Sequence, residues 1–268
     1  MRLVVFHYHL LPGGVTQVIT SSAIAALRYL PDIEGITLVS GNYENTENVI
    51  TDIKTQLKDF NSGIIDVDSF ILPEIGYLSD KTKDPDLKNL KDILNKSFSG
   101  NIWWIHNYHL GKNPIFTEAL LQIAEDFPIQ KMIMQIHDFP EASRYENLEN
   151  LRKYVIRSFY PIYSNVRYVV INSRDYAYLT DAGIPRELVF LLNNPVESLK
   201  REEGKTHFDR LSTALSNRRR KGTMEKIDKI LSKSAPSYIK GAPLMVYPVR
   251  TIRRKNVLEA GLLAKCST

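Results

Sequence analysis

Residues that could bind an anion or exchange a proton recur along this chain, each time just after a short apolar run. His9 follows the first run, and the adjacent Gly13 and Gly14 come directly before a segment with helical periodicity. Glycine lets the backbone approach a ligand closely, and the first N–H groups of a helix have no intrahelical partner, so this turn is suited to phosphate. It is neither GxGxxG nor a P-loop, and a plain chain reversal is the alternative interpretation.

Similar polar clusters follow several of the later apolar runs. The residues concerned are His106, Asn107, His109, Lys112, His137, Asp138, Glu141, Arg144, Asn172, Ser173, Arg174, Asn193 and Asn194. A helix cap or a solvated loop would explain any one of them taken alone. Five successive clusters of this kind instead indicate a common edge where a ligand binds.

The apolar runs and the segments between them predict how this edge is built. Strands are expected at 3–6, 36–40, 64–71, 101–107, 131–137, 167–173 and 188–194, and helices at 15–30, 46–60, 84–97, 114–126, 145–160 and 174–182. Near-continuous apolar strands that alternate with helices predict an α/β, Rossmann-like parallel sheet with helices on both faces. In such folds ligands lie outside the carboxyl ends of the strands, where the polar clusters fall.

Composition narrows the class of protein. The chain has 268 residues, of which 43% are hydrophobic and 24% are charged, and it contains no apolar run long enough to span a bilayer. Its one cysteine, Cys266, cannot form an internal disulfide, which fits a reducing, cytoplasmic location. No Cys/His cluster has zinc spacing, so no structural metal is expected.

The positive charge is concentrated in one segment. Residues 201–240 hold eleven Lys/Arg against five Asp/Glu, a local net charge of +6, so the rest of the chain carries −1 of the total +5. This lopsided charge, without interleaved aromatic residues, argues against nucleic-acid binding. A solvated helical linker is one interpretation, and contact with the anionic inner face of a membrane is the other.

Three regions follow from these patterns. Residues 1–196 form the Rossmann-like domain, 197–242 form a basic, helical linker or insert, and 243–268 read as one strand–loop–helix unit that begins a second domain. One such unit cannot bury its own faces. We therefore expect the chain to be the front part of a longer protein.

With these segments in place, the chain resembles the family-4 glycosyltransferases, which have the two-domain GT-B architecture. The matching stretches are PGGVTQV after the first strand, HDFP at 137–140, INSRDYAYLTDAGIPRELVFLLNNPVE at 171–197 and VYPVRTIRRKN at 246–256. The resemblance covers nearly the whole chain. Its most specific parts are the 171–197 stretch and the pair Arg250 and Lys255.

The resemblance implies hexosyl transfer from a nucleotide-sugar donor to an acceptor hydroxyl, with retention of configuration and without a metal or other cofactor. Arg250 and Lys255 would stabilise the growing negative charge of the diphosphate leaving group, helped by Gly13 and Gly14. His137 would be the catalytic residue that faces the donor sugar. The residues expected to bind a sugar-containing acceptor are His9, His106, Asn107, His109, Lys112 and Asp138.

Two departures from the family pattern limit what this chain would do alone. Asn256 stands where the family usually has Gly after the lysine, and the family's Glu-containing donor loop is absent. We therefore expect little or no transferase activity from the chain by itself. The alternative function is a non-catalytic sugar- or nucleotide-binding Rossmann module, against which the unfinished unit at 243–268 argues.

Overall fold

A computed structural model describes residues 1–58, 66–78, 86–195, 228–230 and 232–233. The chain divides into two compact units, Met1–Val196 and Glu197–Thr268. Within the second unit, residues 228–230 and 232–233 are helical. In the described part of the chain, no helix has the length and apolar character needed to cross a membrane.

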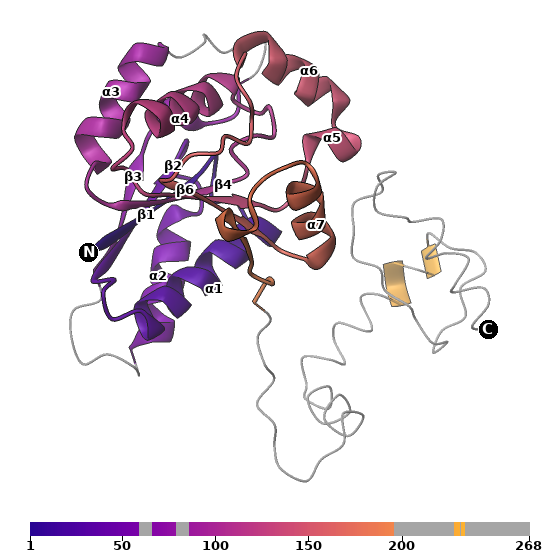
Figure 1. Ribbon diagram of the computed structural model, residues 1–268. Coiled ribbons are helices and arrows are strands. Elements are labelled where there is room, and N and C mark those ends of the chain that lie inside the picture. The colour runs from indigo at the N-terminus through magenta and orange to yellow at the C-terminus, as the bar shows by residue number, and fades with distance from the viewer. Residues whose placement is uncertain (59–65, 79–85, 196–227, 231, 234–268) are drawn as a thin grey trace. The chain divides into compact units, whose positions relative to one another are not determined.

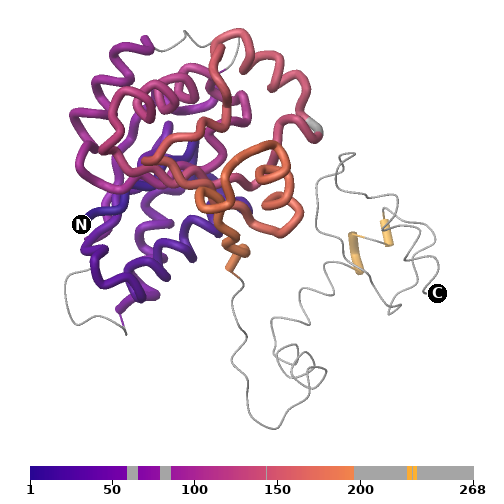
Figure 2. Tube along the Cα trace, viewed as in Figure 1, coloured from indigo at the N-terminus to yellow at the C-terminus, as the bar shows by residue number. Residues whose placement is uncertain are grey.

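The first unit is built on a seven-stranded parallel sheet in the order β3-β2-β1-β4-β5-β6-β7 (Figure 1). The strands are β1 (Arg2–His7), β2 (Gly35–Ser40), β3 (Asp66–Ile71), β4 (Ile102–His106), β5 (Met132–Ile136), β6 (Val166–Val170) and β7 (Val189–Leu191). The chain starts in β1, adds β2 and β3 on one side, and then returns past β1 to add the other four strands (Figure 2). The predicted fold class is confirmed.

Helices cover both faces of this sheet. Helices α1 (Gly14–Tyr29) and α2 (Thr46–Leu57) lie on one face, whereas α3 (Leu87–Phe98), α4 (Pro114–Asp126) and α6 (Tyr145–Tyr154) lie on the other (Figure 1). Side chains of β1 point alternately to the two faces of the sheet and so contribute to the hydrophobic core on each face. Leu3 and Val5 pack in the cluster with α1 and α2, and Val4 and Phe6 pack in the cluster with α3 and α4. Such a two-sided apolar strand is what a covered parallel sheet requires.

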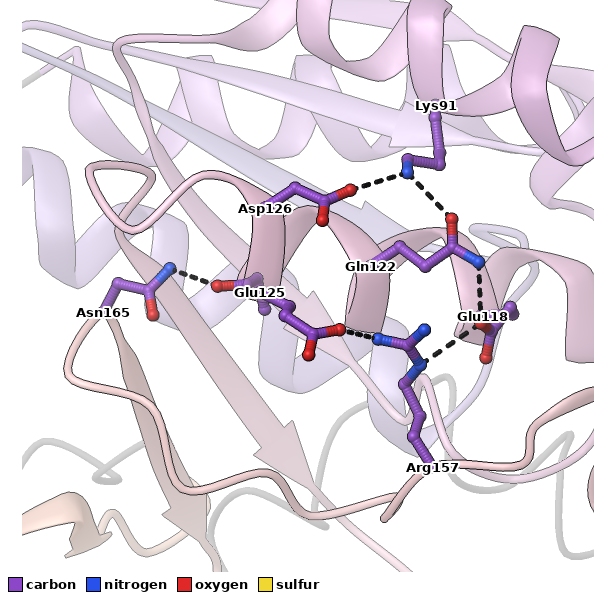
Figure 3. Close-up of polar contacts among 8 residues, drawn as sticks. Lys91, Glu118, Gln122, Glu125, Asp126, Arg157 and Asn165 are labelled. Atoms are coloured by element: carbon purple, nitrogen blue, oxygen red, sulfur yellow. Dashed lines mark hydrogen bonds and ion pairs between the residues drawn. The ribbon is translucent and has the colours of Figure 1, made fainter.

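The helix predicted over 145–160 is wrong beyond Tyr154. A short helix, α5 (Pro140–Ser143), precedes α6, and Val155 then takes an extended conformation with φ −113° and ψ 106°. Arg157 leaves the helical path and pairs with Glu118 and Glu125 of α4 (Figure 3). These ion pairs join residues more than thirty positions apart, so no local periodicity could reveal them.

Helix α4 also contacts α3, and its C-terminal end contacts the segment before β6. Lys91 of α3 donates to Gln122 Oε1 at 2.8 Å and pairs with Asp126 at 2.9 Å (Figure 3). Asn165 donates to three backbone carbonyls, those of Ala124, Phe127 and Gln130, at 3.0 to 3.2 Å. Helix α4 is therefore a fixed support for the loop that precedes it.

That loop is anchored by Asn113, whose side chain is fully buried. Its Oδ1 accepts a hydrogen bond from Phe116 N at 2.9 Å and so caps α4. Its Nδ2 donates to the carbonyls of Glu74 and Gly76, at 2.8 and 2.7 Å, in and just after the short 3₁₀ helix η1 (Pro73–Ile75). One side chain thus joins the segments that follow β3 and β4.

Candidate functional site

The carboxyl edge of the sheet gathers histidines from three neighbouring strands. His7 ends β1, His106 ends β4 and His137 directly follows β5. The ring centroids of His7 and His106 are 6.5 Å apart, and those of His106 and His137 are 5.3 Å apart. Strand order reverses at β1, and such a reversal leaves a crevice beside it where α/β sheets bind ligands.

A hydrogen bond between His106 and His137 fixes the orientation of both rings. His106 Nδ1 lies 2.9 Å from His137 Nε2, with the ring planes 17° apart. His106 Nε2 is buried without a hydrogen-bond partner. A proton there would be a costly orphan donor, so we assign the proton to Nδ1, which donates to His137 Nε2. Neutral His137 then carries its own proton on Nδ1, which has no hydrogen-bond acceptor among the described residues and is available to a ligand.

The backbone next to His137 is held as firmly as its ring. Asn107 Oδ1 accepts a hydrogen bond from His137 N at 2.9 Å. Asn107 itself has φ 55°, a left-handed conformation that asparagine tolerates better than most residues. On β1, His7 Nδ1 donates to the carbonyl of His9 at 2.5 Å, which fixes the tautomer of neutral His7.

Burial keeps these imidazoles uncharged. It lowers the pKa of His7 and of His137 to about 4, and it lowers the pKa of His106 well below its ordinary value. The pKa of His9 is also lowered by burial, against an opposing effect of Glu44. At neutral pH the histidines therefore act as hydrogen-bonding groups, not as cations.

Tyr77 links the first strand to the loop after β4. Its ring centroid lies 5.0 Å from that of His9 and 5.1 Å from that of Tyr8, and Lys112 Nζ lies 5.6 Å from the same centroid. Two hydrogen bonds hold these segments together. Leu78 N donates to the carbonyl of Lys112 at 3.0 Å, and Tyr8 Oη donates to the carbonyl of Asn107 at 3.0 Å. The segment after β3 therefore closes over the end of β1.

Asp138 and Arg144 lie after β5. Arg144 donates from Nε and Nη2 to Asp138 Oδ2, at 3.1 and 2.5 Å. The side chains of both residues are about one-fifth exposed. The pair is therefore accessible from solvent and still held in one orientation.

The turn at Gly13 and Gly14 is open. Gly13 caps α1 without a side-chain hydrogen bond, and the first turn of the helix carries no acidic residue. A Cβ on Gly14 would meet nothing within 4 Å, and a Cβ on Gly13 would meet only the Leu11 carbonyl at 3.8 Å. A cavity of about 340 Å³ lies beside this turn, between α1 and Asn45 and Asn48 of the α2 segment. Packing within the described chain therefore does not require either glycine.

The structure brings most of the predicted site residues together. His9, Lys112, Asp138 and His137 are partly exposed at the edge, and His106 and Asn107 are buried directly beneath it. His109 is the exception, because it is fully buried among the rings of Tyr108, Phe139 and Tyr160, and its pKa is lowered to about 3 by burial. It faces the interior and is not positioned to reach an acceptor.

Other predictions fall on residues that are not described. Arg250, Lys255 and the basic segment 201–240, apart from its helical residues near 230, lie outside the described ranges. Within those ranges, no group of His, Cys, Asp or Glu side chains is arranged to hold a metal ion.

Sequence reasoning missed Tyr77. The rule that placed polar groups at strand ends applied equally to the segment after β3.

Fold and site together define the class of this domain. It is a Rossmann-like α/β domain in which neutral histidines gather at the carboxyl ends of β1, β4 and β5.

Comparison with known proteins points to one relative. The chain is 35% identical over 271 residues to the mannosylglucosyl-3-phosphoglycerate synthase of Petrotoga mobilis (strain DSM 10674 / SJ95). The aligned region covers 98% of this chain and 48% of that synthase, so the chain spans about half the length of the relative. No protein-family model matches the sequence.

Proposed function

We propose that the protein containing this chain is a glycosyltransferase that moves a hexosyl group from a nucleotide-sugar donor to an acceptor hydroxyl. The observation that carries this proposal is the 35% identity, over 98% of the chain, to mannosylglucosyl-3-phosphoglycerate synthase. The motif resemblance adds further parts to this proposal. They are membership of family 4, the GT-B architecture, retention of configuration, and independence from metals and other cofactors. The proposal also places the reaction in the cytoplasm.

The glycine turn supports the donor side of this proposal. Neither Gly13 nor Gly14 has a left-handed backbone conformation, and neither is needed for packing in the described chain. Close approach of a diphosphate to the uncapped N-terminus of α1 would explain why glycine stands at both positions. From the motif resemblance alone, the proposal also assigns Arg250 and Lys255 to stabilising the charge of the diphosphate as the glycosidic bond breaks.

His137 is proposed to hold the donor sugar. Its Nε2 is occupied by His106, and its backbone N–H is occupied by Asn107, so the ring is fixed before any ligand arrives. Such preorganisation costs no reorientation during the reaction. The free Nδ1–H would donate to a sugar hydroxyl, which needs a neutral imidazole of this tautomer.

The acceptor is proposed to resemble that of the relative. The name of the Petrotoga protein specifies a product that joins mannosyl and glucosyl units to 3-phosphoglycerate. We infer that mannose is the sugar transferred and that glucosyl-3-phosphoglycerate is the acceptor. The acceptor would lie along the edge formed by His9, Tyr77 and Lys112.

The test is transfer by the protein at its full natural length. Glucosyl-3-phosphoglycerate is incubated with UDP-, GDP- and ADP-linked hexoses, and mass spectrometry follows the gain of one hexose. His137→Gln should lower kcat/KM by roughly 100-fold, the usual scale for a positioned hydrogen-bonding or proton-transfer group. Gly14→Leu should raise the KM for the donor while leaving the melting temperature unchanged, because a Cβ at this position meets no atom within 4 Å.

Two results would contradict the proposal. One is the absence of hexose transfer from all three nucleotide sugars. In that case binding of a nucleoside diphosphate that Gly14→Leu abolishes would favour the non-catalytic binding module. The other is a His137→Gln protein with the wild-type kcat/KM, which would remove the histidine from the reaction.

A further inference from the structure

A tight backbone contact joins the loop that carries Lys112 to the helix that follows Arg144. Lys112 lies in the loop between β4 and α4, and Arg144 lies immediately before α6. Gly111 has φ +66°, and a Cβ on it would lie 2.1 Å from the Asn147 carbonyl oxygen. The residue before Lys112 therefore touches the first turn of the helix that Arg144 precedes. Only glycine permits this approach.

Lys112 is a partly buried cation that forms no ion pair with a carboxylate in the described part of the chain. Its Nζ lies 5.6 Å from the centre of the Tyr77 ring, which holds the ammonium group by a cation–π interaction. Burial, and then the positive charge of Arg144, lower the pKa of Lys112. Both effects disfavour a bare cation, and a bound anion would relieve both.

Arg144 is held so that part of its guanidinium remains available. Nε and Nη2 both donate to the same oxygen of Asp138, whereas Nη1 has no hydrogen-bond acceptor among the residues that the structure describes. Asp138 neutralises one positive charge, so Lys112, Arg144 and Asp138 together carry a net charge of +1. Because the nearby histidines are neutral, this surplus charge comes from the two cations alone.

We infer that Lys112 and Arg144 form a subsite for a phosphate monoester, namely the phosphoryl group of a phosphorylated sugar-acid acceptor. The inference rests on the proposed function for the identity of the acceptor, but the subsite stands on residues of this chain. Arginine offers a planar array of donors and lysine a point charge, a combination suited to a phosphate. Partial burial strengthens both contacts relative to water. Binding here would direct the sugar hydroxyl of the acceptor towards His137.

The experiment measures binding without any sugar transfer. D-3-phosphoglycerate, inorganic phosphate and D-glycerate are each titrated calorimetrically into the 268-residue chain. D-3-phosphoglycerate and phosphate should bind. Glycerate should not bind, because its only anionic group is a carboxylate. Lys112→Met and Arg144→Gln should each weaken D-3-phosphoglycerate binding by about tenfold, as expected for loss of one charge-assisted contact.

Matched controls separate a local effect from a loss of net charge. Lys96→Met and Arg152→Gln make the same changes on exposed faces of α3 and α6 and should leave the dissociation constant unchanged. Lys112→Arg should keep most of the affinity. Thermal melts show whether each variant is folded. If Arg144→Gln does not fold, the affinity of Lys112→Met for D-3-phosphoglycerate tests the subsite by itself.

Three results would overturn the subsite. The first is no detectable binding of D-3-phosphoglycerate at about 10 mM, which would mean a binding free energy weaker than about −3 kcal/mol. The second is equal affinity of the Lys112→Met and Lys96→Met proteins for D-3-phosphoglycerate. The third is tighter binding of glycerate than of D-3-phosphoglycerate. This binding experiment involves neither a donor nor catalysis, so the two proposals can fail separately. Absence of hexose transfer would refute the proposed function, and binding of D-3-phosphoglycerate would still support the subsite.

Discussion

Replacing Asn113 by alanine should destabilise the first unit far more than the loss of an ordinary helix cap. The side chain is fully buried and makes three hydrogen bonds, one that caps α4 and two that bind the carbonyls of Glu74 and Gly76. Removal of the cap costs about 1 kcal/mol. Each buried carbonyl that loses its donor adds about 1 kcal/mol. The expected decrease in unfolding free energy is therefore about 3 kcal/mol.

Asp86→Ala is the matched control. Asp86 caps α3 through one hydrogen bond from Asn89 N at 3.0 Å, and it is exposed. Its removal should cost about 1 kcal/mol. Urea unfolding gives both values from the transition midpoint, provided that the m-value is unchanged.

Equal destabilisation of the Asn113→Ala and Asp86→Ala variants would refute the reasoning, since it would mean that the two carbonyl contacts contribute nothing. Asn113→Asp provides an independent check. It keeps an acceptor for Phe116 N but turns a carboxylate towards two carbonyls, so it should be at least as destabilising as the alanine. A mild effect of the aspartate would likewise contradict the geometry.

Two further predictions concern the histidines. The pKa values of His7 and His137 are about 4 in the folded chain, compared with 6.5 for an ordinary histidine. Between these two pH values the unfolded chain therefore binds more protons than the folded chain. The stability contributed by each histidine should be fully present above pH 6.5 and should fall by roughly 3 kcal/mol towards pH 4. In urea titrations at several pH values, His7→Gln should lose less stability over this range, and an unchanged loss would contradict the assignment. The hydrogen bond that His106 donates to His137 Nε2 further predicts that neutral His137 carries its proton on Nδ1. Long-range ¹⁵N–¹H NMR measures the position of this proton directly. A proton found on His137 Nε2 would show that the hydrogen bond runs in the opposite direction.

The sequence determined the architecture because the relevant signals are local. Apolar runs such as Val4–Phe6 and Trp103–Ile105 are buried on both faces of a strand in a covered parallel sheet, and the segments between the runs have helical length. Placing polar residues at strand ends was enough to bring His9, His106 and His137 to one edge, because parallel strands share the direction of their carboxyl ends.

Tertiary structure decided what each of these residues can do. The end of α6 at Tyr154, the burial of His109 and the hydrogen bond between His106 and His137 all depend on partners far away in the sequence. The contact between the Lys112 loop and α6 likewise depends on a glycine, Gly111, that packs against Asn147. A residue type fixes which chemistry is available. Whether a side chain is exposed, charged or free to meet a ligand is set by contacts that only the folded chain creates, because burial and neighbouring charges determine its pKa and its hydrogen bonds.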